Sequence, residues 1–99
     1  MIVFVRTGAI APGKGVEAWA FAHKAAAYWK KNFKQELQLL RPIGGNPNRI
    51  AWSTRYSNLA AFEATTGKAM QDKKYLELLV TAGPLFIPGG IHDALWATA

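Results

Sequence analysis

The stretch from Asn48 to Phe62 constrains the fold most, because it runs from a strand through a cap directly into a helix. Ser57 and Asn58 offer side-chain oxygens to the free N–H groups of a helix that begins near Leu59. The stretch therefore predicts a strand at the centre of a sheet, next to the N-terminal strand. Alternate residues before the cap share one face of that strand, and these are Ile50, Trp52, Thr54 and Tyr56.

The first half of the chain contains two further strands and one helix. Residues Ile2–Ile10 are apolar on both faces apart from Arg6 and Thr7, as is typical of a central strand. Helical spacing predicts a helix over Val16–Phe33. The mixed polarity of Lys34–Ile43 suits an edge strand. The side of the helix that is expected to face the sheet carries Trp19, Ala22, Ala26, Trp29 and Phe33.

The second half is predicted to contain a helix, a second helix, a loop and a strand. In the first of these helices, Leu59, Phe62 and Met70 are expected to face the core. Asp72 can cap the second helix, and a Gly-Pro pair ends it. The predicted segments, in the same order, are Leu59–Met70, Lys73–Ala82, Leu85–Ile91 and Asp93–Thr98.

The element order β-α-β-β-α-β predicts two split βαβ units with right-handed crossovers. This is a ferredoxin-like α+β fold, with a four-stranded antiparallel sheet, helices on one face and a single domain over residues 1–99. The opposite face of the sheet then carries mainly small and apolar residues without a cover. Because a monomer rarely exposes such a patch, we expect a homodimer joined through this sheet face.

The charge and composition limit the classes of partner. The net charge is +6, but the basic residues are scattered, whereas a nucleic-acid-binding surface normally concentrates them. The chain has no cysteine, which removes disulfides and thiolate metal ligands and fits the cytoplasm. The N-terminal segment does not resemble a signal peptide, and no stretch approaches the roughly 20 apolar residues of a membrane span. We expect a soluble, cytoplasmic protein with no nucleic-acid or membrane partner.

Two segments of the chain resemble the dimeric α+β barrel superfamily, which includes antibiotic-biosynthesis-monooxygenase-like, stress-responsive barrel and NIPSNAP-like small proteins. They are RIAWSTRYSNLAAFE, Arg49–Glu63, and QDKKYLELLVTAGPLFIPGG, Gln71–Gly90. The resemblance extends over nearly the whole chain. It implies a dimer joined through the open sheet faces and a pocket between each sheet and its helices.

The members of this superfamily include cofactor-free monooxygenases, haem degraders and proteins without known activity. Trp52 is similar in position to a tryptophan of the haem degraders. Arg6 and Thr7 stand where those proteins have an asparagine, and no histidine lies between His23 and His92. The resemblance therefore implies no haem, and we predict no cofactor.

His23 and two arginines are the polar candidates for a site. His23, at the margin of the first helix's apolar side, suits a general base or a ligand contact, or simply a boundary histidine that is hydrogen-bonded to the sheet or a partner. Arg6 and Arg55 lie in the predicted central strands and need a partner, which Glu36, Glu63 or a ligand anion could provide. No carboxylate stands at metal-ligand spacing from either histidine, so no metal site is predicted.

The aromatic candidates are Trp52, Tyr56 and Trp96. They suit the wall of a pocket for a planar hydrophobic ligand, but the core and a dimer interface favour aromatic residues equally. RNA binding is a further alternative, because RNA-recognition motifs share this element order. Ala51 and Ser53, however, occupy the two positions at which that family stacks bases on aromatic rings.

The sequence thus favours a homodimer with an aromatic-lined pocket for a small hydrophobic or anionic ligand. A more specific form of this hypothesis is a cofactor-independent monooxygenase-like enzyme that acts on a small hydrophobic compound. The alternative is a non-catalytic ligand-binding or structural dimer. The residue pattern does not decide between enzyme and non-enzyme.

Overall fold

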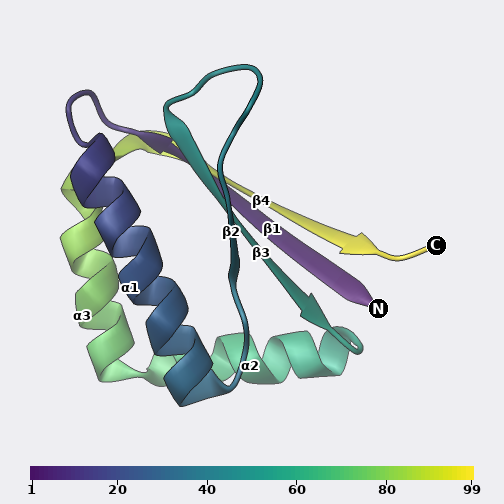
Figure 1. Cartoon of the computed structure of the whole chain (residues 1–99). Helices are drawn as coiled ribbons and strands as arrows, with labels where there is room; N and C mark the ends of the chain where they lie inside the picture. The colour runs from purple at the N-terminus through teal and green to yellow at the C-terminus, as the bar shows by residue number, and fades with distance from the viewer.

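The computed structural model describes all residues from Met1 to Ala99. A four-stranded antiparallel sheet, with strand order β2-β3-β1-β4, has all its helices on one side (Figure 1). This arrangement confirms the predicted ferredoxin-like α+β fold. The elements are β1 (Ile2–Ile10), α1 (Gly15–Phe33), β2 (Gln38–Leu40), β3 (Arg49–Tyr56), α2 (Leu59–Gln71), α3 (Lys73–Ala82), a 3₁₀ turn η1 (Gly83–Leu85) and β4 (Phe86–Ala97).

The two faces of the sheet differ in what covers them. Strand β1 lies at the centre and pairs with β3 from Ile2 opposite Tyr56 to Ala9 opposite Arg49. We call the face toward the helices the inner face. It carries Phe4, Arg6 and Gly8 of β1 and the four predicted residues of β3. Those four residues, Ile50, Trp52, Thr54 and Tyr56, are buried, whereas Phe4 and Arg6 are partly buried. We call the opposite face the outer face, and it carries Val3, Val5, Ala51, Ser53, Ala94 and Trp96.

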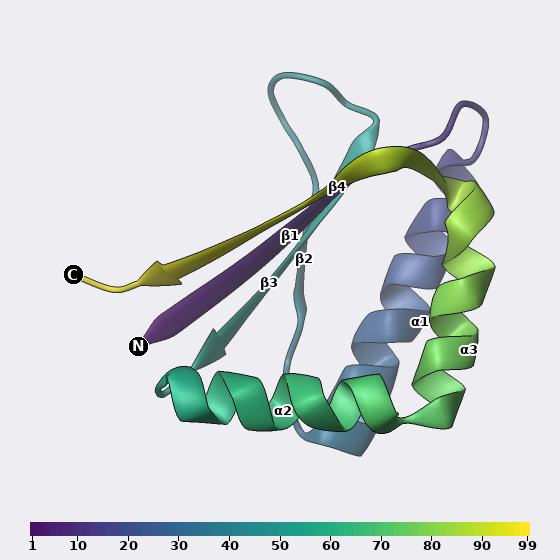
Figure 2. The ribbon, with the colours of Figure 1, turned by 180° about the vertical axis from the view of Figure 1, so that it is seen from behind.

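Helices α1 and α3 lie side by side, and α2 crosses their lower ends beside the sheet (Figures 1 and 2). None of the helices combines the length and the apolar character that a membrane span requires. The buried stripe of α1 differs from the predicted one, because Trp19, Ala26 and Phe33 are only partly buried. Small side chains allow the neighbouring elements to approach this stripe, which consists of Ala18, Ala22, Ala25 and Trp29.

The predictions for β2 and β4 were wrong in extent. Strand β2 has three residues instead of ten. Lys34 belongs to the end of α1, where it takes the left-handed conformation with φ 53°. Strand β4 begins at Phe86, so the loop predicted over Leu85–Ile91 is wrong. Its pairing with β1 shifts between Gly8 and Ile10, so this part of β4 is irregular. Because β4 is an edge strand, it tolerates a proline and a glycine at positive φ here.

Two of the three residues of α2 that were predicted to face the core are exposed. Leu59 and Met70 are about half exposed, and only Phe62 packs inward, against the rings of Phe4 and Tyr56. The reason is that α2 crosses at one end of the sheet and presents only a narrow stripe to it (Figure 2). Ala69 is the single fully buried residue of this helix.

Asp72 caps α3 as predicted and also connects α3 to α1 through a hydrogen bond. Its Oδ1 accepts hydrogen bonds from the Tyr75 backbone N–H at 2.9 Å and the Tyr28 hydroxyl at 2.8 Å. These two bonds, the backbone bond most of all, lower the pKa of Asp72 below its usual value. A carboxylate with a lowered folded-state pKa stabilises the fold above its unfolded-state pKa, and this contribution is lost as the pH falls through the folded-state pKa.

We therefore expect Asp72→Ala to destabilise the protein more at pH 7 than at about pH 3, which lies below the unfolded-state pKa of about 3.9, where the contribution of the carboxylate is already reduced. Urea unfolding of variant and parent at both pH values measures the difference. Asp72→Asn is the matched control, because an asparagine still caps the helix but does not titrate. Equal destabilisation of Asp72→Ala at the two pH values would contradict the assigned role of the carboxylate.

Candidate ligand-binding cavity

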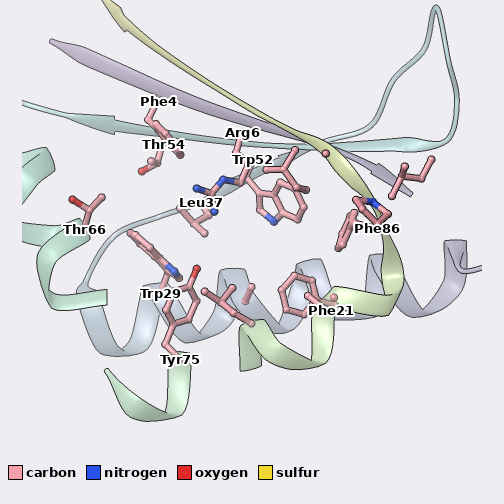
Figure 3. A pocket seen from close by; sticks show the side chains of 18 of the residues that line it. Phe4, Arg6, Phe21, Trp29, Leu37, Trp52, Thr54, Thr66, Tyr75 and Phe86 are labelled. Carbon is pink, nitrogen blue, oxygen red and sulfur yellow. The ribbon is translucent and has the colours of Figure 1, made fainter. Parts of the chain in front are cut away.

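A cavity of about 330 Å³ lies between the inner face of the sheet and helices α1 and α3 (Figure 3). Thirteen of its 19 lining residues are hydrophobic. This volume lies in the range of about 300–1,000 Å³ that is typical of small-molecule sites. The side chains labelled in Figure 3 reach into this space from the sheet above and the helices below.

The rings of Phe21, Trp52 and Phe86 form one end of the cavity. The ring centroid of Phe86 lies 5.9 Å from that of Trp52 and 6.1 Å from that of Phe21. Gly8 makes room for this packing, since a Cβ atom there would lie 3.0 Å from Ile91 Cδ1 and 3.1 Å from the ring of Phe86. This end is therefore apolar and closely packed.

Tyr75 of α3 and Trp29 of α1 line the other end. The Tyr75 ring stacks on Tyr28 at 6.0 Å and meets the edges of Trp29 at 5.8 Å and Phe33 at 5.9 Å. Residues Trp29 and Tyr75 are buried, with 7% and 6% exposure. The neighbouring rings hold Tyr75 in a fixed orientation, with its hydroxyl toward the cavity (Figure 3).

Arg6 is the only charged side chain that lines the cavity. Its Nε donates to Asp93 Oδ1 at 2.7 Å and its Nη2 donates to Asp93 Oδ2 at 2.9 Å. These hydrogen bonds raise the pKa of Arg6 above its usual value. The guanidinium also lies 5.7 Å from the centroid of the Phe4 ring. The sequence analysis offered Glu36, Glu63 or a ligand anion as the partner of Arg6. The ion pair in the structure is instead with Asp93, which is directly opposite Arg6 on β4.

Two buried donors of the cavity wall have no hydrogen-bond partner within the protein. They are Nε1 of Trp29 and the hydroxyl of Tyr56. Burial raises the pKa of the Tyr56 phenol, and the nearby Thr54 hydroxyl offsets only part of the rise. Thr54 itself accepts a hydrogen bond of 2.7 Å from Gln35 Nε2. Since buried polar groups are normally paired, the unpaired donors point to a missing partner.

Comparison with known proteins identifies the fold. No family model matches the chain, and no curated protein matches it in sequence. Among solved structures, a NIPSNAP domain protein from Burkholderia xenovorans has a TM-score of 0.85 at 16% identity, over 100% of this chain and 95% of the other. A NIPSNAP family protein from Agrobacterium tumefaciens has a TM-score of 0.83 at 15% identity, over 99% and 92%.

An enzyme is also among the similar structures. It is SnoaB, a cofactor-independent oxygenase from Streptomyces nogalater, with a TM-score of 0.73 at 15% identity over 98% of this chain and 91% of the other. The chain has the ferredoxin-like α+β fold of these proteins. The resemblance to antibiotic-biosynthesis-monooxygenase-like and NIPSNAP-like proteins is thus confirmed for the fold, and identities this low carry no statement about activity.

The structure brings three of the six predicted site residues together. Arg6, Trp52 and Tyr56 all line the cavity. Arg55 is exposed on the outer side of β3, and Trp96 is 65% exposed on the outer face. Both therefore lie away from the cavity, and their predicted contact with a ligand stays a prediction.

His23 is exposed on α1, with its ring 6.4 Å from that of Trp19, and it is not among the residues that line the cavity. Its role as a general base also stays a prediction. The titratable side chains that do line the cavity are Arg6, Tyr56 and Tyr75. No three His, Asp or Glu side chains form a group that could hold a metal ion.

Sequence reasoning missed several residues of the cavity. Phe86 was placed in a loop because of the proline and glycines after it. Trp29 and Tyr75 were treated only as apolar positions of helices. A signal for Tyr75 existed, since the capping residue Asp72 fixes where α3 begins and so which of its residues face α1. Asp93 gave no usable signal, because its pairing with Arg6 joins residues that are 87 positions apart.

Proposed function

We propose that this protein binds a small, planar, largely apolar compound in the cavity between its sheet and its helices. The observation that carries the proposal is an unfilled space of about 330 Å³ whose wall is mainly hydrophobic. Trp52 and Tyr56 belong to the wall and do not occupy the space, as they would in a purely structural core. Flat aromatic surfaces on both the sheet and the helix side suit a flat ligand.

We further propose that two copies of the chain associate through the outer face. Supporting this, the centre of that face consists of small and apolar side chains, among them Val3, Val5 and Ala94, with Trp96 exposed at its edge. The helices lie on the other side of the sheet, so nothing within the chain covers this surface (Figure 1). A dimer through the outer face leaves the cavity of each copy unobstructed.

A second candidate function is oxygenation of the bound compound. The structural similarity to a cofactor-independent oxygenase supports it. In such a reaction an activated methylene of the substrate becomes a carbonyl. One atom of O₂ forms the new C=O bond, the other leaves as water with both methylene hydrogens, and the substrate itself supplies the electrons. An anthrone has such a methylene and the planar shape that the cavity suits.

Oxygen uptake separates the catalytic from the non-catalytic form of the proposal. With an anthrone as the probe, an oxygenase should consume O₂ faster than the protein-free solution and form an equimolar amount of anthraquinone. Binding of the anthrone without any gain in rate would assign the protein to the non-catalytic class.

Blocking the cavity tests the proposed binding itself. Ala25 is 4% exposed and lines the cavity, so the larger side chain of Ala25→Leu enters the space that the ligand needs. We expect the affinity for a neutral planar probe, the methyl ether of lawsone, to fall by about tenfold or more when measured by calorimetric titration.

Ala27→Leu is the matched control, because Ala27 lies on the same helix but is exposed. Thermal unfolding of both variants verifies that each is folded at the temperature of the titration. Equal affinities of Ala25→Leu and Ala27→Leu for the probe would show that the ligand does not occupy this cavity, and no binding by the parent would contradict the proposed function.

A further inference from the structure

The polar groups that line the cavity are the Arg6 guanidinium, the Trp29 indole N–H and four hydroxyls, whereas its wall carries no carboxylate or amide side chain. No Asp, Glu, Asn or Gln is among the 19 lining residues. The only formal charge on the wall is the positive charge of Arg6. Because the Arg6 guanidinium and the unpaired Trp29 N–H can only donate, a ligand that pairs with them supplies an acceptor oxygen, and a negatively charged oxygen pairs with a guanidinium most strongly.

Arg6 has donor capacity beyond its ion pair. Asp93 occupies Nε and one N–H of Nη2, so Nη1 and the second N–H of Nη2 have no partner within the protein. The two bonds to Asp93 fix the plane of the guanidinium, and the Phe4 ring at 5.7 Å supports it. Figure 3 shows the Arg6 side chain extending from β1 toward the helices.

Tyr75 approaches from the opposite wall. Its hydroxyl makes no hydrogen bond within the protein, whereas the hydroxyl of Tyr28 beside it is bonded to Asp72. The ring of Tyr75 is fixed by three aromatic neighbours, so the position of this hydroxyl is also fixed. Arg6 and Tyr75 extend toward one another across the cavity (Figure 3). A small oxygen substituent of a bound ligand can therefore lie between them.

Building on the proposed function, we propose that the cavity selects planar apolar compounds that carry an anionic oxygen, which Arg6 and Tyr75 bind together. The anionic oxygen can belong to a phenolate, an enolate or a carboxylate, and in each case it is attached to a hydrophobic ring system. The guanidinium supplies charge and N–H donors, and the Tyr75 hydroxyl supplies a further donor. The rest of the ligand lies against Trp52 and Phe86, where the wall is apolar.

This arrangement gives the ligand one orientation. Its oxygen is held beside Arg6 and its rings extend toward the apolar end of the cavity. Each bound molecule therefore presents the same carbon atoms to the same part of the wall. For an enolisable compound, the contacts also favour the enolate over the neutral form, because a positive charge and donors lower the pKa of the bound acid.

A matched pair of probes tests the selection. Lawsone, a hydroxynaphthoquinone, is an enolate at neutral pH, and its methyl ether has the same rings but no ionisable oxygen. We expect the parent protein to bind lawsone about tenfold or more tightly than the ether in calorimetric titrations. Naphthoate, titrated in the same way, shows whether a carboxylate or an enolate is the better source of the anionic oxygen.

Tyr75→Phe is the sharpest variant, because it removes only a hydroxyl that the fold does not use. We expect it to weaken the binding of lawsone by about tenfold and to leave the binding of the ether unchanged. Tyr28→Phe is the matched control and should retain the full preference for lawsone, since the Tyr28 hydroxyl bonds Asp72 instead.

A second variant removes the charge. Arg6→Met combined with Asp93→Leu deletes the ion pair as a unit, so no unpaired charge is left, and these half-exposed side chains contribute little to the fold. We expect this double variant to bind lawsone no more tightly than the ether.

The outcomes separate this inference from the proposed function. Equal parent affinities for lawsone and the ether, with both lost in Ala25→Leu, would overturn the selection for an anionic oxygen and leave the cavity as the binding site. An undiminished preference for lawsone in Tyr75→Phe, or in the double variant at Arg6 and Asp93, would overturn the assignment of these residues. If neither probe binds, the proposed function fails and the inference fails with it.

Discussion

Replacing Trp52 with alanine should lower the free energy of unfolding by about 3–5 kcal/mol, the usual cost of deleting a large buried aromatic side chain. Trp52 is 8% exposed and packs in the main core cluster with Ile50 and Phe86. The alanine leaves a void between β3, α1 and β4 that the surrounding elements fill only in part, because each is fixed by its own pairing in the sheet or by its helix.

Urea unfolding at one protein concentration, followed by circular dichroism, measures this change. Trp52→Phe is the graded control, since a smaller ring keeps part of the contact with Phe86 and should cost clearly less. If Trp52→Ala unfolds at the same urea concentration as the parent, the side chain does not belong to the core.

The structure places Trp52 and Tyr56 in the core and at the cavity at once, and their contact with a ligand stays a prediction. Each side chain is buried in the core and each also forms part of the cavity wall. One inner face of β3 serves both purposes because the helices cover the sheet without filling the space beneath it. A sequence pattern can assign these residues to the inner face, but the distance between the layers depends on the packing of α1 against α3.

The parts of the fold that local signals determine were predictable. Strand β3, the Asn58 cap and α2 follow from alternation and capping within a short segment, and Asn58 Oδ1 does accept from the Ala61 backbone N–H at 2.8 Å. The start of β4 was not predictable in this way. Pro88 and Gly89 normally favour a turn, and they lie within β4 because Phe86 and Ile91 on either side of them pair with Ile10 and Gly8 of the distant strand β1.

The candidate site also has parts that local sequence signals determine and parts that they do not. Alternation along β1 places Arg6 on the same face as Phe4 and Gly8, but both faces of this strand are largely apolar, so the pattern did not show which face is toward the helices. The partner of Arg6 and its counterpart across the cavity could not be predicted either, since Asp93 and Tyr75 reach it only through the register of β4 and the placement of α3. The chemistry of the cavity therefore depends on contacts between segments that the sequence pattern treats separately.

Under the proposed association of two copies through the outer face, replacing Val5 with glutamate should convert the dimer into a monomer. Val5 lies on the outer face of the central strand, between Ser53 of β3 and Ala94 of β4. At the centre of a face-to-face interface its carboxylate would lose water without gaining a partner, and this is strongly unfavourable. Light scattering at micromolar concentration should give about twice 10.8 kDa for the parent and 10.8 kDa for the variant.

The size of the expected effect follows from the area of the interface. Two copies that pack through their outer faces need to bury about 1,600 Å² for a stable association, and one central charge within such an area is enough to prevent it. Ala20→Glu is the matched control, because Ala20 is exposed on α1, on the far side of the sheet from the outer face, and this variant should remain a dimer. A monomeric parent protein, or a Val5→Glu variant that scatters as a dimer, would show that the outer face is not where two copies meet.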